Sequence, residues 1–210
     1  MPLSTRESLL LKLKQTSEHT SCNQDAWFEF VELYGPVVYG RCLRAGLQSA
    51  DAQSVTQDVF VRVYRAIGRF EYDRARGQFR SWLYRITRNE IRRMITRGQK
   101  RANAVGGGLA DHLLDLSSEN AGSEWDDEIN RRIYELASER IKEDFPDEFA
   151  VFQKIWEDSR PPADIAMEYG KTRAWVYQVK YRVLRRLEAE VQRLSEDQFP
   201  FPNTPPKDES

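Results

Sequence analysis

"FRSWLYRITRNEIRRMITRGQKR", residues 79–101, decides the fold more than any other stretch of this sequence. Its large apolar side chains are spaced for a helix that turns by about 100° per residue. One face then gathers Phe79, Trp82, Leu83 and Ile86. A different face carries Ser81, Arg85, Arg88 and Arg92. The spacing predicts a helix with one face in a protein core and another face toward something anionic.

The segment before it, residues 49–70, also has a helical period. Val55, Val59, Val63 and Ile67 recur every four residues, and Ser49 or Asp51 can cap the start of this helix. Further large and polar side chains leave more apolar area than one face can bury: Asp51, Gln57, Asp58, Phe60, Val61 and Tyr64. A partner-binding face and a second buried stripe explain these residues equally well.

The flanking sequence extends this helical pattern in both directions. Asp25 is predicted to cap a helix from Ala26 to about Leu47, which Pro36 interrupts and near whose end Gly46 lies. Glycines and serines after residue 101 predict a flexible linker, and helical periodicity returns near residue 125 with a break at Pro146. The sequence predicts an all-α fold of two small helical domains. The expected parts are an N-terminal segment 1–24, a domain 25–101, a linker 102–125, a domain 126–194 and a disordered Pro-rich tail 195–210.

The second domain contains a pattern typical of a helix-turn-helix, "PPADIAMEYGKTRAWVYQVKYRVLRRL", residues 161–187. Ala166 is small where two helices cross, Gly170 permits a turn with positive φ, and Val176 packs the second helix. The second helix would point Lys171, Arg173, Tyr177, Gln178, Lys180, Tyr181 and Arg182 outward. Arg and Gln can pair with base edges in a major groove, whereas Lys mostly holds phosphates. An ordinary helical hairpin with a solvated basic face is the alternative.

Charge is divided sharply along the chain, although the net charge is −1. Residues 62–101 carry 13 Lys and Arg against three acids, a net +10. Residues 111–158 carry five against 15, a net −10, and residues 159–193 carry eight against four, a net +4. Two basic segments separated by an acidic one indicate polyanion contact at two places. Aromatic rings near the first basic segment, among them Tyr72 and Trp82, can stack on unpaired bases, although core packing is an alternative for each ring.

Composition excludes several other classes. No apolar run approaches the roughly 18–20 residues that cross a bilayer, and the N-terminus lacks the apolar core of a signal peptide. Two cysteines without a CxxC spacing, and two histidines, disfavour a disulfide framework and a structural zinc site. We therefore expect a cytoplasmic protein with no metal, no cofactor and no contact with a membrane.

Two basic helical modules joined by a flexible acidic linker resemble an extracytoplasmic-function (ECF, group IV) sigma factor of the sigma-70 family. The resemblance covers about residues 25–101 and 126–193. Its most specific string is "DAQSVTQDVFVRVYRAIGRFEYDRARGQFRSWLYRITRN", residues 51–89, which looks like regions 2.2 and 2.3. "VYQVKYRVLRRLEAE", residues 176–190, looks like the end of the region 4 recognition helix and is similar to a planctomycete-like variety.

The resemblance implies a role for each of three groups of residues. Those matching the surface that docks on the β′ clamp helices of core RNA polymerase are Asp51, Gln57, Asp58, Phe60, Val61 and Tyr64. Those matching the part that melts and holds the −10 element are Tyr72, Arg76, Arg80, Trp82, Arg85, Arg88, Asn89, Arg92 and Arg93. Those placed to read the −35 element are Lys171, Arg173, Ala174, Trp175, Tyr177, Gln178, Lys180, Tyr181 and Arg182. The implied partners are core RNA polymerase, through the clamp helices and the β flap, and promoter DNA; an anti-sigma factor is left open.

Some positions depart from the family pattern. Ser54 stands where an acid is usual, Arg93 where an Asp is usual, and Asp164 where a Glu is usual. "KTRAW", residues 171–175, replaces the usual small or hydroxyl residues at the start of the recognition helix. The family's −35 preference therefore cannot be carried over to this chain.

The sequence thus predicts a sigma factor without enzyme activity. A stand-alone helix-turn-helix regulator is the alternative, but it needs a dimer surface for symmetric half-sites, and no heptad is visible. An enzyme acting on nucleic acid would need clustered carboxylates, an HxE with a CxxC, or P-loop glycines, and none of these occurs in the sequence.

Overall fold

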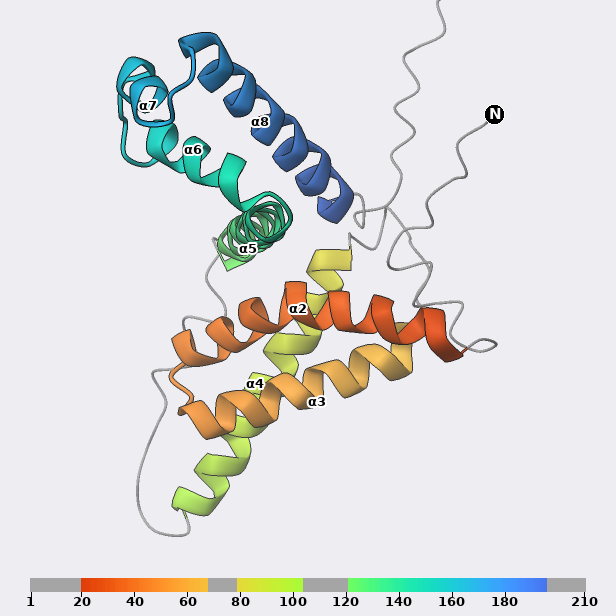
Figure 1. Ribbon diagram of the computed structural model, residues 1–210. Helices are drawn as coiled ribbons and strands as arrows, with labels where there is room; N and C mark the ends of the chain where they lie inside the picture. The colour runs from red at the N-terminus through yellow and green to blue at the C-terminus, as the bar shows by residue number, and fades with distance from the viewer. Residues whose placement is uncertain (1–19, 68–78, 104–120, 196–210) are drawn as a thin grey trace, which may run out of the picture. The chain divides into compact units, whose positions relative to one another are not determined.

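The computed structural model describes residues 20–67, 79–103 and 121–195, and every regular element in these ranges is an α-helix (Figure 1). The helices are α2 (Thr20–Arg44), α3 (Ser49–Ile67), α4 (Phe79–Asn103), α5 (Ala121–Asp144), α6 (Pro146–Trp156), α7 (Pro162–Glu168) and α8 (Arg173–Ser195). The all-α prediction is confirmed. Contacts divide the chain between Arg132 and Ile133, within α5. We call the part before this division unit 1 and the part from Ile133 to Glu196 unit 2.

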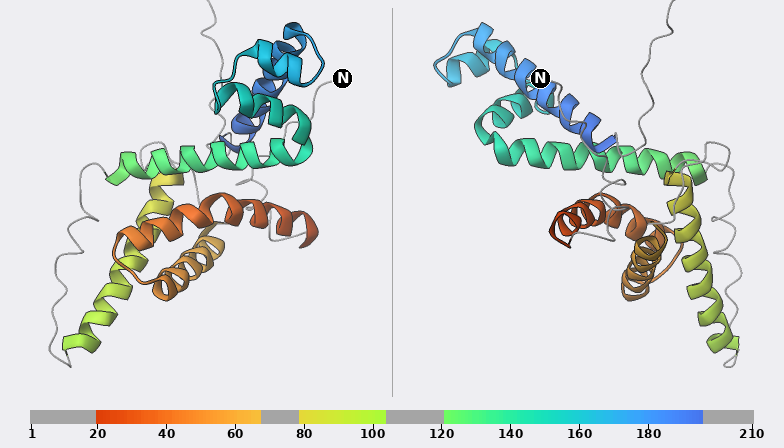
Figure 2. Two further views of the ribbon diagram at one scale, coloured as in Figure 1. Left: turned by 60° about the vertical axis from the view of Figure 1, so that its left-hand side comes forward. Right: turned by 90° about the vertical axis from the view of Figure 1, so that its right-hand side faces the viewer.

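In unit 1, α2 and α3 run antiparallel and α4 packs across them (Figures 1 and 2). The predicted stripe of Val55, Val59, Val63 and Ile67 is buried, as is Phe79 at the start of α4. Phe30 of α2 lies at the centre and is fully buried. Its ring contacts those of Trp27, Tyr34, Phe60 and Phe79, with centroids 4.8–5.9 Å apart. This aromatic cluster fixes the face of α4 that remains outside.

The bounds of α2 differ in part from the prediction. Its end is nearly as expected, at Arg44 rather than about Leu47, because Gly46 has φ 80° and the Leu47 amide donates to the Cys42 carbonyl at 3.2 Å, a helix-ending turn that favours glycine. Its start is not, because the helix begins at Thr20 and Asp25 lies inside it. Once Ala26 and Phe30 are packed, adding a turn before them costs little, and residues 20–25 contain neither Pro nor Gly.

The thiol of Cys42 is fully buried in α2 and is not in a disulfide. Burial raises its pKa to about 11, against a smaller lowering by a hydrogen bond with Thr56. Thiol reagents attack the thiolate, so at pH 8 the native Cys42 should react at least about tenfold more slowly than an exposed thiol. Timed labelling of a Cys22→Ser variant in native buffer and in urea tests this. Equal rates in the two solvents would contradict it.

In unit 2, the second half of α5 and α6 to α8 enclose a core that includes Ile133, Phe152, Ile165, Val176 and Val183. Pro146 is the first residue of α6, and only Phe145 separates it from the end of α5, so the predicted break is confirmed. The predicted helix-turn-helix is confirmed as well: Gly170 has φ 61° between α7 and α8. The Lys171 amide closes the turn by donating to the Ala166 carbonyl at 2.8 Å.

The linker expected over 102–125 overlaps helix at both ends, since α4 runs to Asn103 and α5 begins at Ala121. Residues 104–120 between them, residues 68–78 and the two chain ends lie outside the described residues.

Candidate polymerase and nucleic-acid interfaces

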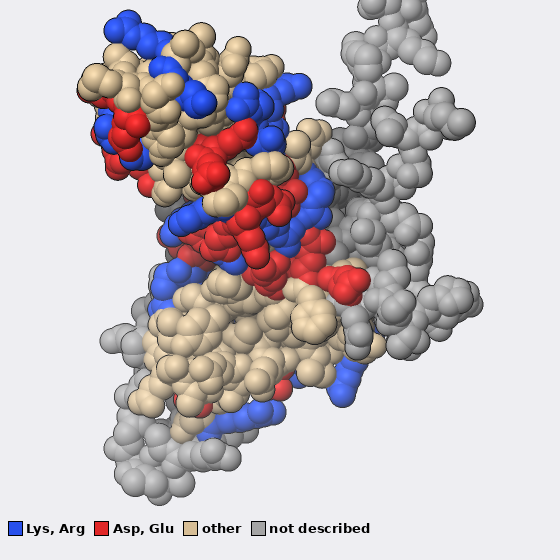
Figure 3. Space-filling model, in the orientation of Figure 1, with Lys and Arg blue, Asp and Glu red and all other residues tan. Residues whose placement is uncertain are grey.

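The outer face of α3 is exposed. Gln57 and Asp58 are exposed, Val61 is 46% exposed and Tyr64 is 55% exposed, so they do not form a second buried stripe. The Tyr64 ring and the Trp27 ring of α2 pack in a T-shaped arrangement, with their centroids 5.4 Å apart. This contact holds the phenol in place on the surface. Figure 3 shows few charged side chains over α2 and α3 on the face toward the viewer. The geometry provides an apolar surface with the Asp58 carboxylate on the same face.

Phe60 is not exposed on this docking face, where the resemblance places it. Its side chain is only 9% exposed and packs edge-on against Phe30 at 5.8 Å and Trp27 at 6.1 Å. The period of α3 places it beside the buried stripe of Val59 and Val63 rather than on the outer face. Phe60 supports the face from within.

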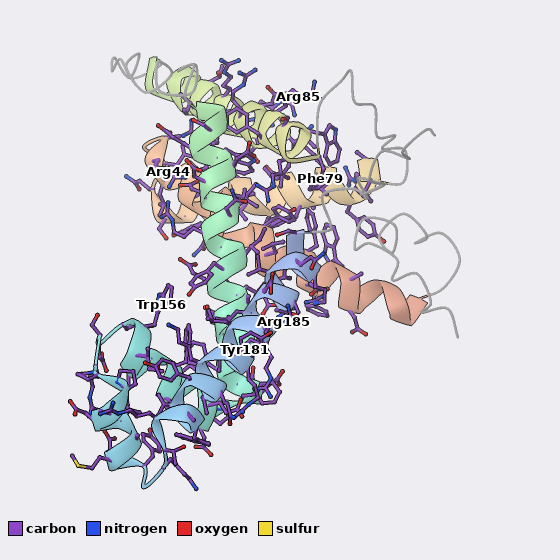
Figure 4. The ribbon with its side chains drawn as sticks, turned by 90° about the horizontal axis from the view of Figure 1, so that it is seen from above. Arg44, Phe79, Arg85, Trp156, Tyr181 and Arg185 are labelled. Carbon is purple, nitrogen blue, oxygen red and sulfur yellow. The ribbon has the colours of Figure 1, made fainter. Side chains whose placement is uncertain are left out.

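On α4, the predicted polar stripe lies outside. Arg85 and Asn89 are exposed, and Arg88 and Arg92 are half-buried. Trp82 is also half-buried, with its ring 5.5 Å from Phe79 at the edge of the core. Figure 4 shows Arg85 on α4. Tyr72 and Arg76 lie outside the described residues.

Two other arginines of α4 have partners within unit 1. Arg80 is only 6% exposed, and it donates to the Asn130 side chain of α5 at 2.9 Å. Burial lowers the pKa of Arg80, and the nearby Tyr34 and Asp126 oppose that shift. Arg93 pairs with the buried Glu90 at 2.9 Å. Arg80, a −10 contact by the resemblance, is therefore buried in this structure against a partner from a distant part of the chain.

On α8, the outward residues are Arg173, Ala174, Tyr177, Gln178 and Tyr181, with Lys171 in the turn before them. Tyr177 is 57% exposed and Tyr181 is 63% exposed. The Thr172 hydroxyl accepts from the Trp175 amide at 3.2 Å and so caps the helix. Trp175 itself is half-buried, with its ring 5.9 Å from Tyr169, and is not fully outward.

Arg182, predicted to face DNA, is held by Glu148 of α6. It donates to this carboxylate through two nitrogens at 2.8 and 3.0 Å, and Arg186 contacts the other oxygen. Although burial raises the pKa of Glu148, the hydrogen bonds from Arg182 and Arg186 outweigh it and hold the pKa below its ordinary 4.5. Arg182 therefore fixes α6 to α8 in this structure.

This cluster predicts an acid-sensitive unit 2. A carboxylate whose folded pKa is depressed stabilises the fold at pH values above 4.5 and loses that contribution as the pH falls through the folded value. Wild-type protein should therefore lose stability below pH 4.5 more steeply than a Glu148→Gln variant. Urea titrations of both proteins at several acidic pH values, followed by amide exchange in α8, measure the difference. Parallel pH profiles would contradict it.

The exposed face of α8 and the end of α6 include further residues that the sequence pattern did not indicate. Trp156 at the end of α6 is 57% exposed, and Lys180 lies over its ring at 5.7 Å. Arg185 lies over the Tyr181 ring at 6.0 Å, and Figure 4 shows these two residues along α8. The missed signal for Arg185 was its spacing, four residues after Tyr181. Trp156 continues the apolar helical period of Phe149 and Phe152, and only the fold shows that its ring lies outside.

Residues 30–101 match the model of the Sigma-70 region 2 family. The match takes in α3, α4 and most of α2, and therefore both outer faces of unit 1. Residues 30–101 thus form a sigma-70 region 2 domain. The planctomycete-like variety remains a prediction.

Three curated relatives are RNA polymerase sigma factors, and two of them bear ECF names. The chain is 33% identical over 81 residues to the ECF RNA polymerase sigma factor SigE of Mycolicibacterium smegmatis, covering 38% of this chain and 30% of that protein. It is 34% identical over 67 residues to the ECF RNA polymerase sigma factor SigW of Bacillus subtilis, covering 32% and 34%. It is 32% identical over 112 residues to the RNA polymerase sigma factor CnrH of Cupriavidus metallidurans, covering 53% and 54%. The matched part thus spans about a third to about half of these relatives.

All the described candidate residues of α3 and α4 lie within the sigma-70 region 2 match. Those of α8 lie beyond residue 101, outside the match. Among the described residues, no helix combines the length and the apolar character that crossing a membrane requires.

Proposed function

We propose that this protein is an ECF sigma factor that binds core RNA polymerase and directs promoter-specific initiation of transcription. The observation that carries the proposal is the sigma-70 region 2 match over residues 30–101. The matched residues include the exposed apolar face of α3 and the arginine stripe of α4. A stand-alone helix-turn-helix regulator is not favoured, because it gives no reason for a region 2 domain. In this role the protein would have no catalytic activity of its own.

Core polymerase would bind the outer face of α3. This face combines the exposed apolar side chains of Val61 and Tyr64 with the Asp58 carboxylate, and Asp51 and Gln57 are exposed on the same helix. A rigid aromatic anchor beside a charge is typical of the residues that dominate an interface. We assign this face to the β′ clamp helices of the polymerase.

Promoter DNA would contact both units. The stripe of Arg85, Arg88, Asn89 and Arg92 is suited to the −10 element, where arginines hold phosphates and Trp82 can meet an unpaired base. In unit 2, which we assign to region 4, the exposed face of α8 would enter the major groove at the −35 element. Its Arg173 and Gln178 can form bidentate pairs with base edges.

Further parts of the proposal rest on the family alone. The family resemblance gives the domain bounds of 25–101 and 126–194. A role with core polymerase also implies contact of unit 2 with the β flap and a cytoplasmic location. An anti-sigma factor covering these faces would be a further partner, and no residue of this chain identifies one.

Run-off transcription tests the proposal. Bacterial core polymerase would be incubated with pooled promoter fragments of the host genome, with and without this protein. Specific starts that require the protein are the expected result. No added transcripts, together with tight binding to duplex DNA without polymerase, would overturn it in favour of the stand-alone regulator.

A further inference from the structure

Within unit 1, the first half of α5 packs against α2 and α4. Trp125 is only 2% exposed, and Ile129 is fully buried. The Trp125 indole donates to the Arg80 carbonyl at 3.1 Å, and its ring lies 5.6 Å from that of Tyr84. This single large side chain therefore anchors a segment that is 45 residues away from Arg80 in sequence.

Charged and polar groups surround this anchor, and all of them face arginines. On the α5 side they are Glu124, Asp126, Glu128 and Asn130, and on the α2 and α4 side they are Arg41, Arg44 and Arg80. Glu124 lies 3.7 Å from Arg41, and Glu128 pairs with Arg44, which Figure 4 shows beside α5. Acidic side chains of α5 thus occupy Arg80 of the basic segment 62–101 and two arginines of α2.

We propose that residues 121–132 are an autoinhibitory cover, which hides Arg80 from nucleic acid until it is displaced. The proposal rests on the proposed function in one respect, that unit 1 binds a single DNA strand. A phosphate backbone offers arginines the same anionic oxygens as Glu128 and Asp126 do. The cover and a DNA strand therefore compete for one set of cations.

The ion pairs at the edge of the cover are weak, whereas Trp125 and Ile129 hold it by apolar burial. Glu124 is 60% exposed and Asp126 is 51% exposed, so water screens their pairs with Arg41 and Arg80. The exposed arginines of α4, such as Arg85, remain available for a first contact while the cover is in place. Binding of a strand there and release of residues 121–132 would then be coupled, since the affinity of a site falls by the fraction of time that it is covered.

The test uses the whole chain and an oligothymidine of about 20 nucleotides, without polymerase. Glu128→Lys places a cation against Arg44 and should open the cover. Asp127→Lys is the matched control, because it makes the same change of charge at the neighbouring exposed residue of the same helix. We expect Glu128→Lys to bind about three- to tenfold more tightly than Asp127→Lys in fluorescence anisotropy. Adding Arg80→Ala to Glu128→Lys should remove most of that difference.

Amide exchange over residues 125–132 provides a readout of the cover itself. It should be faster in Glu128→Lys than in Asp127→Lys, and oligothymidine should accelerate it in the wild type. Equal affinities of the two lysine variants, or unchanged exchange in the presence of oligothymidine, would overturn the cover and leave Arg80 as a structural residue. Trp125→Ala should open the cover independently, provided that amide exchange in α3 shows an intact core.

The two proposals can fail separately. Absence of specific transcripts with the wild type and with Glu128→Lys would overturn the sigma-factor assignment, whereas the exchange of residues 125–132 would still decide the cover. Normal transcription with equal affinities of the two lysine variants would overturn only the cover.

Discussion

Replacing Phe30 with alanine is expected to lower the free energy of unfolding of unit 1 by about 3–5 kcal/mol. Phe30 has no exposed surface, and its ring joins α2 to Phe60 of α3 and Phe79 of α4. Truncation removes the buried apolar area and leaves a cavity between three helices, which cannot all close on it. The loss is a large fraction of the stability of a small domain.

Phe28→Ala is the matched control, because Phe28 lies two residues earlier on α2 and is 69% exposed. Its substitution should change stability by no more than about 0.5 kcal/mol. Amide exchange of α3 and α4 under increasing urea reports unit 1 without interference from unit 2. Equal effects of the two substitutions would show that the aromatic cluster does not hold these helices together.

The double variant Asp58→Ala/Tyr64→Ala is expected to lose at least about 30-fold in promoter-specific transcription at limiting protein concentration, because one hot-spot residue alone contributes about 2 kcal/mol or more to binding. Both side chains are exposed, so the fold should survive the change. Run-off transcription across a range of protein concentrations measures the loss. A rightward shift of the titration, with unchanged transcripts at saturation, would show that polymerase binding is what was lost.

Tyr134→Ala/Asp144→Ala on α5 is its control, since it removes the same two side chains from exposed positions of unit 2. It should leave the midpoint of the titration within about twofold of the wild type. An identical loss in both double variants would argue against α3 as the docking face. Phe60→Ala is unsuitable for this test, because the buried ring of Phe60 belongs to the core.

The local pattern of the sequence was enough to predict the helices, their buried stripes and the turn at Gly170. Val55, Val59 and Val63 must share a side of any helix that contains them, whatever packs against it. Gly170 supplies a backbone conformation that few other residues adopt, so its spacing from Ala166 and Val176 carries the turn. The string over residues 51–89 likewise carries the resemblance to region 2 without any knowledge of tertiary contacts.

The partners of long polar side chains were decided only by the tertiary structure. Arg80 and Arg182 stand in basic stretches of sequence, yet their acceptors, Asn130 and Glu148, lie 50 and 34 residues away. Periodicity states which side of a helix a residue occupies, but not whether another helix covers that side. Phe60 shows the same limit at the border of a buried stripe, where a small difference in angle decides between core and surface. The sequence by itself therefore determined the helices and the resemblance to sigma-70 region 2, and the packing of distant helices decided which of the basic and aromatic side chains remain outside.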